Sequence, residues 1–116
     1  LLARSFLIHV ASHPPQSSRP AEAVRTTAGI GAWRKVQVHL YFEGPAVRAL
    51  DEFADELAEG ELFAQYLPAV PNHGGKIFVD QGNLLLSSIQ PSVPFDRVSS
   101  DETPRFAAQA DHVMRF

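Results

Sequence analysis

Apolar residues in this chain occur in short runs, which are separated by polar stretches rich in glycine and proline. Two runs are typical of buried strands, residues 5–10 (Ser-Phe-Leu-Ile-His-Val) and residues 36–42 (Val-Gln-Val-His-Leu-Tyr-Phe), and the second is the strongest strand signal in the chain. Weaker patterns predict three further strands at residues 76–80, 95–99 and 112–116. The pattern therefore predicts a sheet of about five strands.

Helical segments are predicted between the first three strands. A helix over residues 21–30 or 21–32 follows Pro20, which suits a first helical turn because the N–H that proline lacks has no helical partner there. The residues after Glu43-Gly44-Pro45 predict a longer helix that ends at Gly60, because their apolar members recur at helical spacing: Val47, Leu50, Phe53, Ala54, Leu57 and Ala58. A second short helix is predicted over residues 62–67.

The last third of the chain is expected to contain two short helical pieces. Residues 81–89 are expected to form a loop that leads into the first of these pieces. The other continues through residues 106–110, with Asp101 as its predicted N-cap and Pro104 in its first turn.

Strands that alternate with helices predict a parallel sheet covered on both faces. The expected architecture is a three-layer α/β/α, Rossmann-like fold with a mainly parallel sheet. The 116 residues fit one domain, residues 1–116, and such a domain folds without a disulfide or metal.

Charge and composition exclude several classes of function. The formal net charge of −3 offers no basic field for nucleic acid or for an acidic membrane surface. The chain contains no cysteine, which excludes thiolate nucleophiles, Cys-zinc sites, iron–sulfur clusters and persulfides. No apolar run approaches the ~20 residues that span a bilayer. No signal peptide is expected, and a cytoplasmic location is predicted.

Polar residues gather where the predicted strands end. His13 follows the first strand, Glu43 ends the second, and Asp80, Gln81 and Asn83 follow the third. Ligands of open α/β sheets bind at this edge, so these residues are candidates for a ligand pocket. The alternative is that Asp, Asn and Gly serve only as turn residues, and the turn is the favoured interpretation for Asp80 and Gln81.

The first loop and the histidines have alternative interpretations as well. Ser17 and the backbone before the first helix are candidates to bind an anion, or Ser17 or Ser18 simply caps that helix. His9 and His39 are expected to be half-buried strand residues rather than metal ligands, and no metal or cofactor is predicted. His73 is expected at the opposite edge from His13.

Two surface features are candidates for contact with a partner protein. The acidic run from residue 51 to residue 61 is expected to be a solvated face, with a docking surface for a basic partner as the alternative. Trp33 either anchors an interface or covers the edge of the sheet.

Three segments resemble the DsrE, DsrF and TusD-like proteins of bacterial sulfur relays: residues 6–13 (Phe-Leu-Ile-His-Val-Ala-Ser-His), residues 41–45 (Tyr-Phe-Glu-Gly-Pro) and residues 110–116 (Ala-Asp-His-Val-Met-Arg-Phe). The resemblance implies a Rossmann-like domain that forms homo- or hetero-oligomers. It also implies that relay members accept a persulfide on a cysteine after the third strand, about where Asp80 or Gln81 stands here.

The predicted function follows from this resemblance and from the missing cysteine. We expect a DsrE-like domain that is not a cysteine-dependent sulfurtransferase. Its leading role would be a non-catalytic oligomeric or scaffold subunit, as a homo-oligomer or beside related DsrE-like subunits. The alternative is a small-molecule or anion-binding protein, or an enzyme, that uses the strand-end pocket without thiol chemistry. No catalytic residue is assigned.

Overall fold

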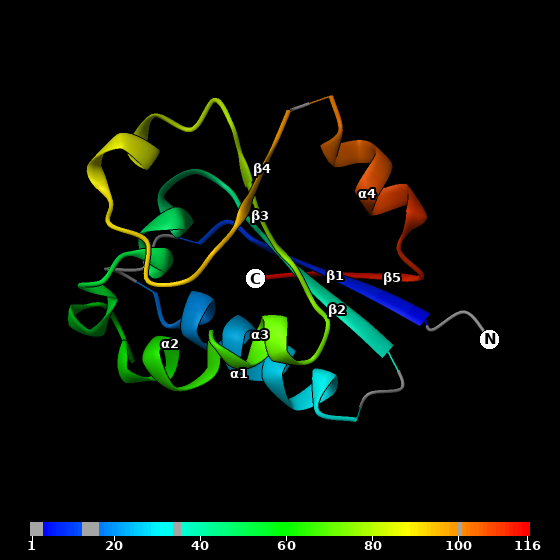
Figure 1. The fold of residues 1–116 in the computed structure, drawn as a ribbon, viewed down its shortest axis with the longest axis horizontal. Helices are drawn as coiled ribbons and strands as arrows, with labels where there is room; N and C mark the ends of the chain where they lie inside the picture. The colour runs from blue at the N-terminus through cyan, green and yellow to red at the C-terminus, as the bar shows by residue number, and fades with distance from the viewer. Residues whose placement is uncertain (1–3, 13–16, 34–35, 100) are drawn as a thin grey trace.

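Five parallel strands form the centre of the protein in a computed structural model that describes residues 4–12, 17–33, 36–99 and 101–116. Their order across the sheet is β4-β3-β2-β1-β5, and every neighbouring pair is parallel (Figure 1). The strands are β1 (Arg4–Val10), β2 (Val36–Phe42), β3 (Ile77–Asp80), β4 (Asp96–Val98) and β5 (His112–Arg115). The predicted α/β class is therefore confirmed, and all five predicted strands are present.

Helices cover the two faces of the sheet unequally. Figure 1 shows α1, α2 and α3 together on one side of the strands and α4 by itself on the other. The α-helices are α1 (Arg19–Gly31), α2 (Glu61–Tyr66), α3 (Ala69–Asn72) and α4 (Thr103–Gln109), and the 3₁₀ helices are η1 (Gly44–Leu50), η2 (Ala54–Glu56) and η3 (Leu84–Ser88). Within the described ranges, no helix has the length and apolar character needed to cross a membrane.

The face covered by α1, hereafter the α1 face, holds the main core. Alternate strand residues point to it because successive strand side chains project to opposite faces. Fully buried members from the strands include Ile8, Val10, Leu40, Phe42 and Val79. Small residues of α1, such as Ala21, Ala23 and Val24, let that helix pack closely on the sheet.

The opposite face, hereafter the α4 face, has a smaller apolar cluster. Leu7, Tyr41, Phe78 and Val98 form it, and Phe106 of α4 packs against them with its ring stacked on Phe78 at 4.8 Å between centroids. Between these residues the alternation places polar side chains on the same face, including His9, His39, Glu43 and Asp80. The α4 face therefore carries most of the polar side chains of the sheet.

The prediction of one long helix after Pro45 is wrong. Two short 3₁₀ helices, η1 and η2, occupy that segment, and the backbone at Asp51 is extended. Long-range bonds explain the break: Ser92 N–H donates to the Leu50 carbonyl at 2.8 Å, and Glu52 N–H donates to the Gln90 carbonyl at 2.8 Å. The acidic side chains between residues 52 and 61 are nevertheless exposed to solvent, as expected.

The predicted N-cap of the last helix is also wrong. The helix begins at Thr103, with Glu102 rather than Asp101 at the N-cap position. An N-cap side chain accepts from the N–H of the second or third helical residue, and with Asp101 as the cap the third would be Pro104, which has no N–H. Ser99 Oγ instead bonds Glu102 Oε1 at 3.1 Å.

Candidate functional site

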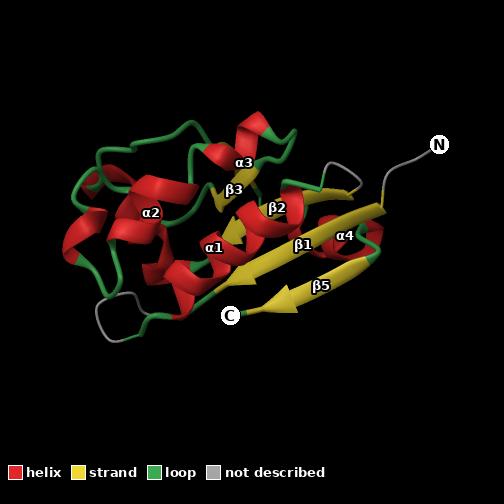
Figure 2. Cartoon of the chain, turned by 90° about the horizontal axis from the view of Figure 1, so that it is seen from below, coloured by secondary structure: helices red, strands yellow, loops and turns green. Residues whose placement is uncertain are grey.

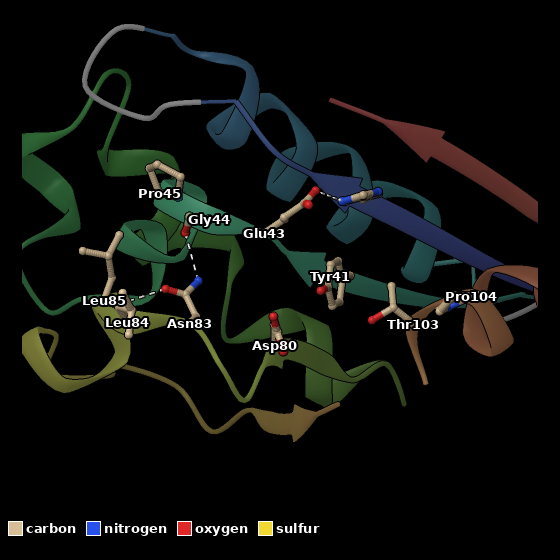
Figure 3. Close-up of a pocket in the computed structure, with 11 residues that line it drawn as sticks. Tyr41, Glu43, Gly44, Pro45, Asp80, Asn83, Leu84, Leu85, Thr103 and Pro104 are labelled. Carbon is tan, nitrogen blue, oxygen red and sulfur yellow. Dashed lines mark hydrogen bonds and ion pairs between the residues drawn. The ribbon is translucent and has the colours of Figure 1, made fainter. Parts of the chain in front are cut away.

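A cavity of about 540 Å³ lies at the C-terminal ends of β1, β2 and β3, on the α4 face (Figure 3). Parallel strands bring their C-terminal ends to one edge, and the register places His9 beside Tyr41. The loops after β2 and β3 and the start of α4 complete the wall. The lining residues are His9, Tyr41, Glu43, Gly44, Pro45, Asp80, Asn83, Leu84, Leu85, Thr103 and Pro104.

A chain of three side chains crosses the sheet beside this cavity. His9 Nε2 lies 2.7 Å from Glu43 Oε2, and Arg115 Nη1 lies 3.1 Å from His9 Nδ1. A guanidinium has only donors, so His9 Nδ1 must accept from Arg115. The ring proton then sits on Nε2, which donates to Glu43. These two bonds orient the His9 ring and connect β5, β1 and the residue that follows β2.

Two hydroxyl groups that line the cavity, those of Tyr41 and Thr103, have no hydrogen-bond partner among the residues that the structure describes. Thr103 Oγ1 is buried and has no hydrogen bond to any described residue. Tyr41 is only 6% exposed, its ring meets that of His9 edge-on at 5.2 Å, and none of the hydrogen bonds among the described residues uses its hydroxyl. Buried polar groups in native proteins nearly always have a partner, so the Thr103 hydroxyl lacks a bond that a water or a ligand could supply.

The loop after β3 is held by its own side chains. Asp80 Oδ1 accepts from Gly82 N–H at 3.1 Å, which is a local turn. Asn83 Oδ1 accepts from Leu85 N–H at 3.0 Å, and Asn83 Nδ2 donates to the Gly44 carbonyl at 3.1 Å. Gly44 has a φ of 56°, a left-handed conformation that favours glycine. Asn83 therefore fixes the cavity wall.

The structure brings together three of the candidate pocket residues, Glu43, Asp80 and Asn83. Gln81 is exposed and lines a separate hollow beside Arg97, and its backbone N–H donates to the Val98 carbonyl at 2.8 Å. Ser17 Oγ accepts from Arg19 N–H at 3.1 Å, a bond at the start of α1.

His13, another candidate pocket residue, lies outside the residues that the structure describes. The helix-cap interpretation of the first loop has a local basis, because Ser18 occupies the N-cap position of α1, although its side chain makes no capping bond.

Sequence reasoning missed His9, Tyr41 and Thr103 as cavity residues. The alternation of β1 and β2 places positions 9, 41 and 43 on one face, which is a signal for the first two. Using it requires knowing that β1 and β2 are neighbours in this register. Nothing in the local sequence indicates that Thr103 approaches the same edge.

The remaining histidines have separate environments. His39 is half-buried on the α4 face, and its Nδ1 accepts from Lys76 N–H at 2.9 Å. Burial, and then the nearby Lys76 charge, lowers the pKa of His39. His73 follows α3 at the other end of the sheet, and its buried Nδ1 has no described partner. Among the residues described, no three His, Asp or Glu side chains gather closely enough to hold a metal ion.

Trp33 does not cover the edge of the sheet. It lies just beyond the C-terminal end of α1 and is 74% exposed. Its other predicted role, as an anchor for an interface, stays a prediction.

No protein-family model matches this chain, and no curated protein sequence matches it. Among solved structures, it is similar to the crystal structure of the YchN protein from E. coli, with a TM-score of 0.78 and 16% sequence identity. The match covers 97% of this chain and 99% of that one. An identity this low shows the fold alone. The protein therefore shares the fold of that structure, which agrees with the predicted α/β, Rossmann-like fold.

Proposed function

We propose that this chain is a DsrE-like domain that binds a small molecule in the strand-end cavity and works without thiol chemistry. The observation that carries the proposal is the buried Thr103 hydroxyl, which lines the cavity and has no partner among the described residues. An unpaired buried hydroxyl costs about 1–3 kcal/mol, and a bound molecule that hydrogen-bonds it recovers that free energy. Ligand sites in open α/β folds lie at this end of the sheet.

Sulfur transfer is not part of the proposal, because the chain has no thiol. Asp80 begins the loop where the resemblance places the relay cysteine, and one of its carboxylate oxygens accepts a bond within that turn. A carboxylate cannot form a persulfide. We expect that incubation with a persulfide donor leaves the mass of this chain unchanged, and a gain of one sulfur atom would contradict the proposal.

The test is a fragment screen by NMR on the wild type and on Thr103→Val. Fragments are expected to shift the amides around Tyr41, Glu43 and Asp80, and Thr103→Val should weaken their binding at least about threefold through the lost hydrogen bond. The matched control is Thr26→Val, on α1 and away from the cavity. Fragments that shift only other surfaces, or that bind equally well to both variants, would reject the proposal.

A second candidate function is an oligomeric, non-catalytic subunit, beside copies of itself or related DsrE-like chains. The observation that favours it is strand β5, which Figure 2 shows outermost beside β1. All four residues of β5 are exposed, including Val113 at 39% and Met114 at 37%. An edge strand with exposed apolar residues is a common site for pairing with another chain.

Sedimentation velocity at ten to one hundred micromolar tests this second function. An oligomer that dissociates in the variant Met114→Glu, but not in the control Glu102→Gln, would support assembly through β5. A wild-type monomer over the whole range would remove its basis.

A further inference from the structure

We propose that the strand-end cavity takes an organic cation, a molecule with an ammonium group and an apolar body. This inference rests on the proposed function, because it names the class of molecule that the same cavity binds. The argument uses the charge of the lining, the hydrogen-bonding capacity of its free atoms, and the apolar surface beside them.

The charged groups that line the cavity are carboxylates. Glu43 and Asp80 both contribute to the lining, and the third ionisable side chain, His9, already bonds Glu43 through Nε2 and Arg115 through Nδ1. The Arg115 guanidinium donates to His9 Nδ1 and is not one of the lining residues. An anion entering here would meet two negative groups, whereas a cation would be attracted.

The free atoms of the lining are mainly acceptors. Glu43 uses Oε2 and Asp80 uses Oδ1 in the bonds described above, which leaves one oxygen of each carboxylate for a ligand. The hydroxyls of Tyr41, which is 6% exposed, and of Thr103, which is buried at its oxygen, can also accept. An ammonium group has three donors and no acceptor, so it matches this set.

Apolar surface lies next to these acceptors. Leu84 is 91% exposed, and Leu85, Pro45 and Pro104 line the same cavity (Figure 3). An exposed leucine beside a cavity gains stability when a ligand covers it. The cavity therefore combines acceptors at its strand ends with an apolar rim.

The experiment compares three probes that share one apolar body and differ in head-group charge: 2-phenylethylamine, 2-phenylethanol and phenylacetate. Their binding to the full chain is followed by amide chemical shifts at neutral pH. The cation is expected to bind at least about tenfold more tightly than the alcohol, with the largest shifts at Tyr41, Glu43, Asp80 and Leu84. Phenylacetate is expected to give no shifts at those residues.

Two variants and one control locate the effect. Asp80→Asn and Glu43→Gln remove one charge each while keeping the shape of the side chain, and each is expected to weaken the amine about three- to tenfold. Asp96→Asn, an exposed carboxylate on β4 outside this cavity, should leave binding unchanged.

The outcomes separate this inference from the proposed function. If phenylacetate or the alcohol binds in the cavity as tightly as the amine, the cation inference is wrong and the cavity remains a ligand site. If Asp80→Asn and Glu43→Gln bind the amine as the wild type does, the inference is also wrong. If none of the three probes shifts the cavity residues at millimolar concentration, while the fragment screen still finds ligands there, only the cation inference falls. If both experiments fail at the cavity, the proposed function falls with it.

Discussion

The two faces of one sheet differ in what they contribute to this protein. On the α1 face, the inner strands β1, β2 and β3 supply mainly apolar, buried side chains, and three helices cover them. On the α4 face, apolar residues alternate in space with histidines and carboxylates, and one seven-residue helix covers them. Because a strand sends alternate side chains to opposite faces, the same strands stabilise the fold with one set and present polar groups with the other.

The largest difference between the faces should appear when adjacent aromatic residues of β2 are truncated. Phe42 is fully buried on the α1 face, so Phe42→Ala should cost about 3–5 kcal/mol and leave little folded protein in mild urea. Tyr41→Phe on the α4 face removes only the hydroxyl, which bonds none of the described residues, and should change the free energy of unfolding by less than about 1 kcal/mol. Urea denaturation followed by circular dichroism measures both. Equal losses would show that the α4 face carries as much of the fold.

A second, smaller effect should appear at the cavity wall. Asn83→Ala removes the bonds to Leu85 N–H and the Gly44 carbonyl, and should destabilise the protein by about 1–3 kcal/mol. Gln81→Ala, two residues earlier and exposed, is the control and should change stability by less than about 0.5 kcal/mol. If Asn83→Ala is as stable as the control, Asn83 does not fix the wall.

The pH dependence of stability should trace in part to His39 on the α4 face. Its pKa is lowered by burial and then by Lys76, so the folded state favours the neutral ring. Below about pH 6.5 the unfolded chain takes up a proton that the folded chain does not, so stability falls as the pH falls from there toward the lowered pKa.

His39→Asn keeps an acceptor near Lys76 N–H but cannot titrate. The free energy of unfolding of this variant should depend less on pH between 4 and 7 than that of the wild type. His112→Asn, on exposed strand β5, serves as the control and should keep the wild-type slope. A variant His39→Asn with the wild-type slope would assign the pH dependence to other groups.

The smallest effect on stability is expected from Arg115→Met. The lost bond to His9 Nδ1 is at the surface and should cost about 0.2–1 kcal/mol. The informative measurement is the nitrogen NMR spectrum of His9, in which Nδ1 should begin to carry the proton because no donor faces it any longer. An unchanged tautomer would show that Glu43 alone orients the ring.

These predictions also mark where sequence reasoning succeeds. The strands could be predicted because their patterns are local, and residues 36–42 match β2 at both ends. The helix after Pro45 could not, because bonds from Gln90 and Ser92 determine the backbone at Asp51, and no local pattern contains them.

The residues of the candidate site also fall into a predictable and an unpredictable group. Glu43, Asp80 and Asn83 lie at the end of a strand or within three residues of it, so their common edge is predictable from a parallel sheet. His9 and Tyr41 require the strand order, which the sequence does not contain. Thr103 requires the path of the chain from β4 into α4 across the sheet.

The bond from Arg115 to His9 has a consequence for the thermodynamics of the whole chain. Arg115 belongs to the outermost strand, while His9 lines the cavity. The hydrogen bond between them therefore links the edge of the sheet to the cavity, because the proton of the His9 ring must lie on the nitrogen that does not face Arg115. A molecule that binds better to one tautomer of His9 would change the free energy that holds β5 in place. By linkage, a chain that pairs with β5 and shifts Arg115 would change the affinity of the cavity by the same factor. Assembly and ligand binding, if this protein does both, are therefore reciprocal.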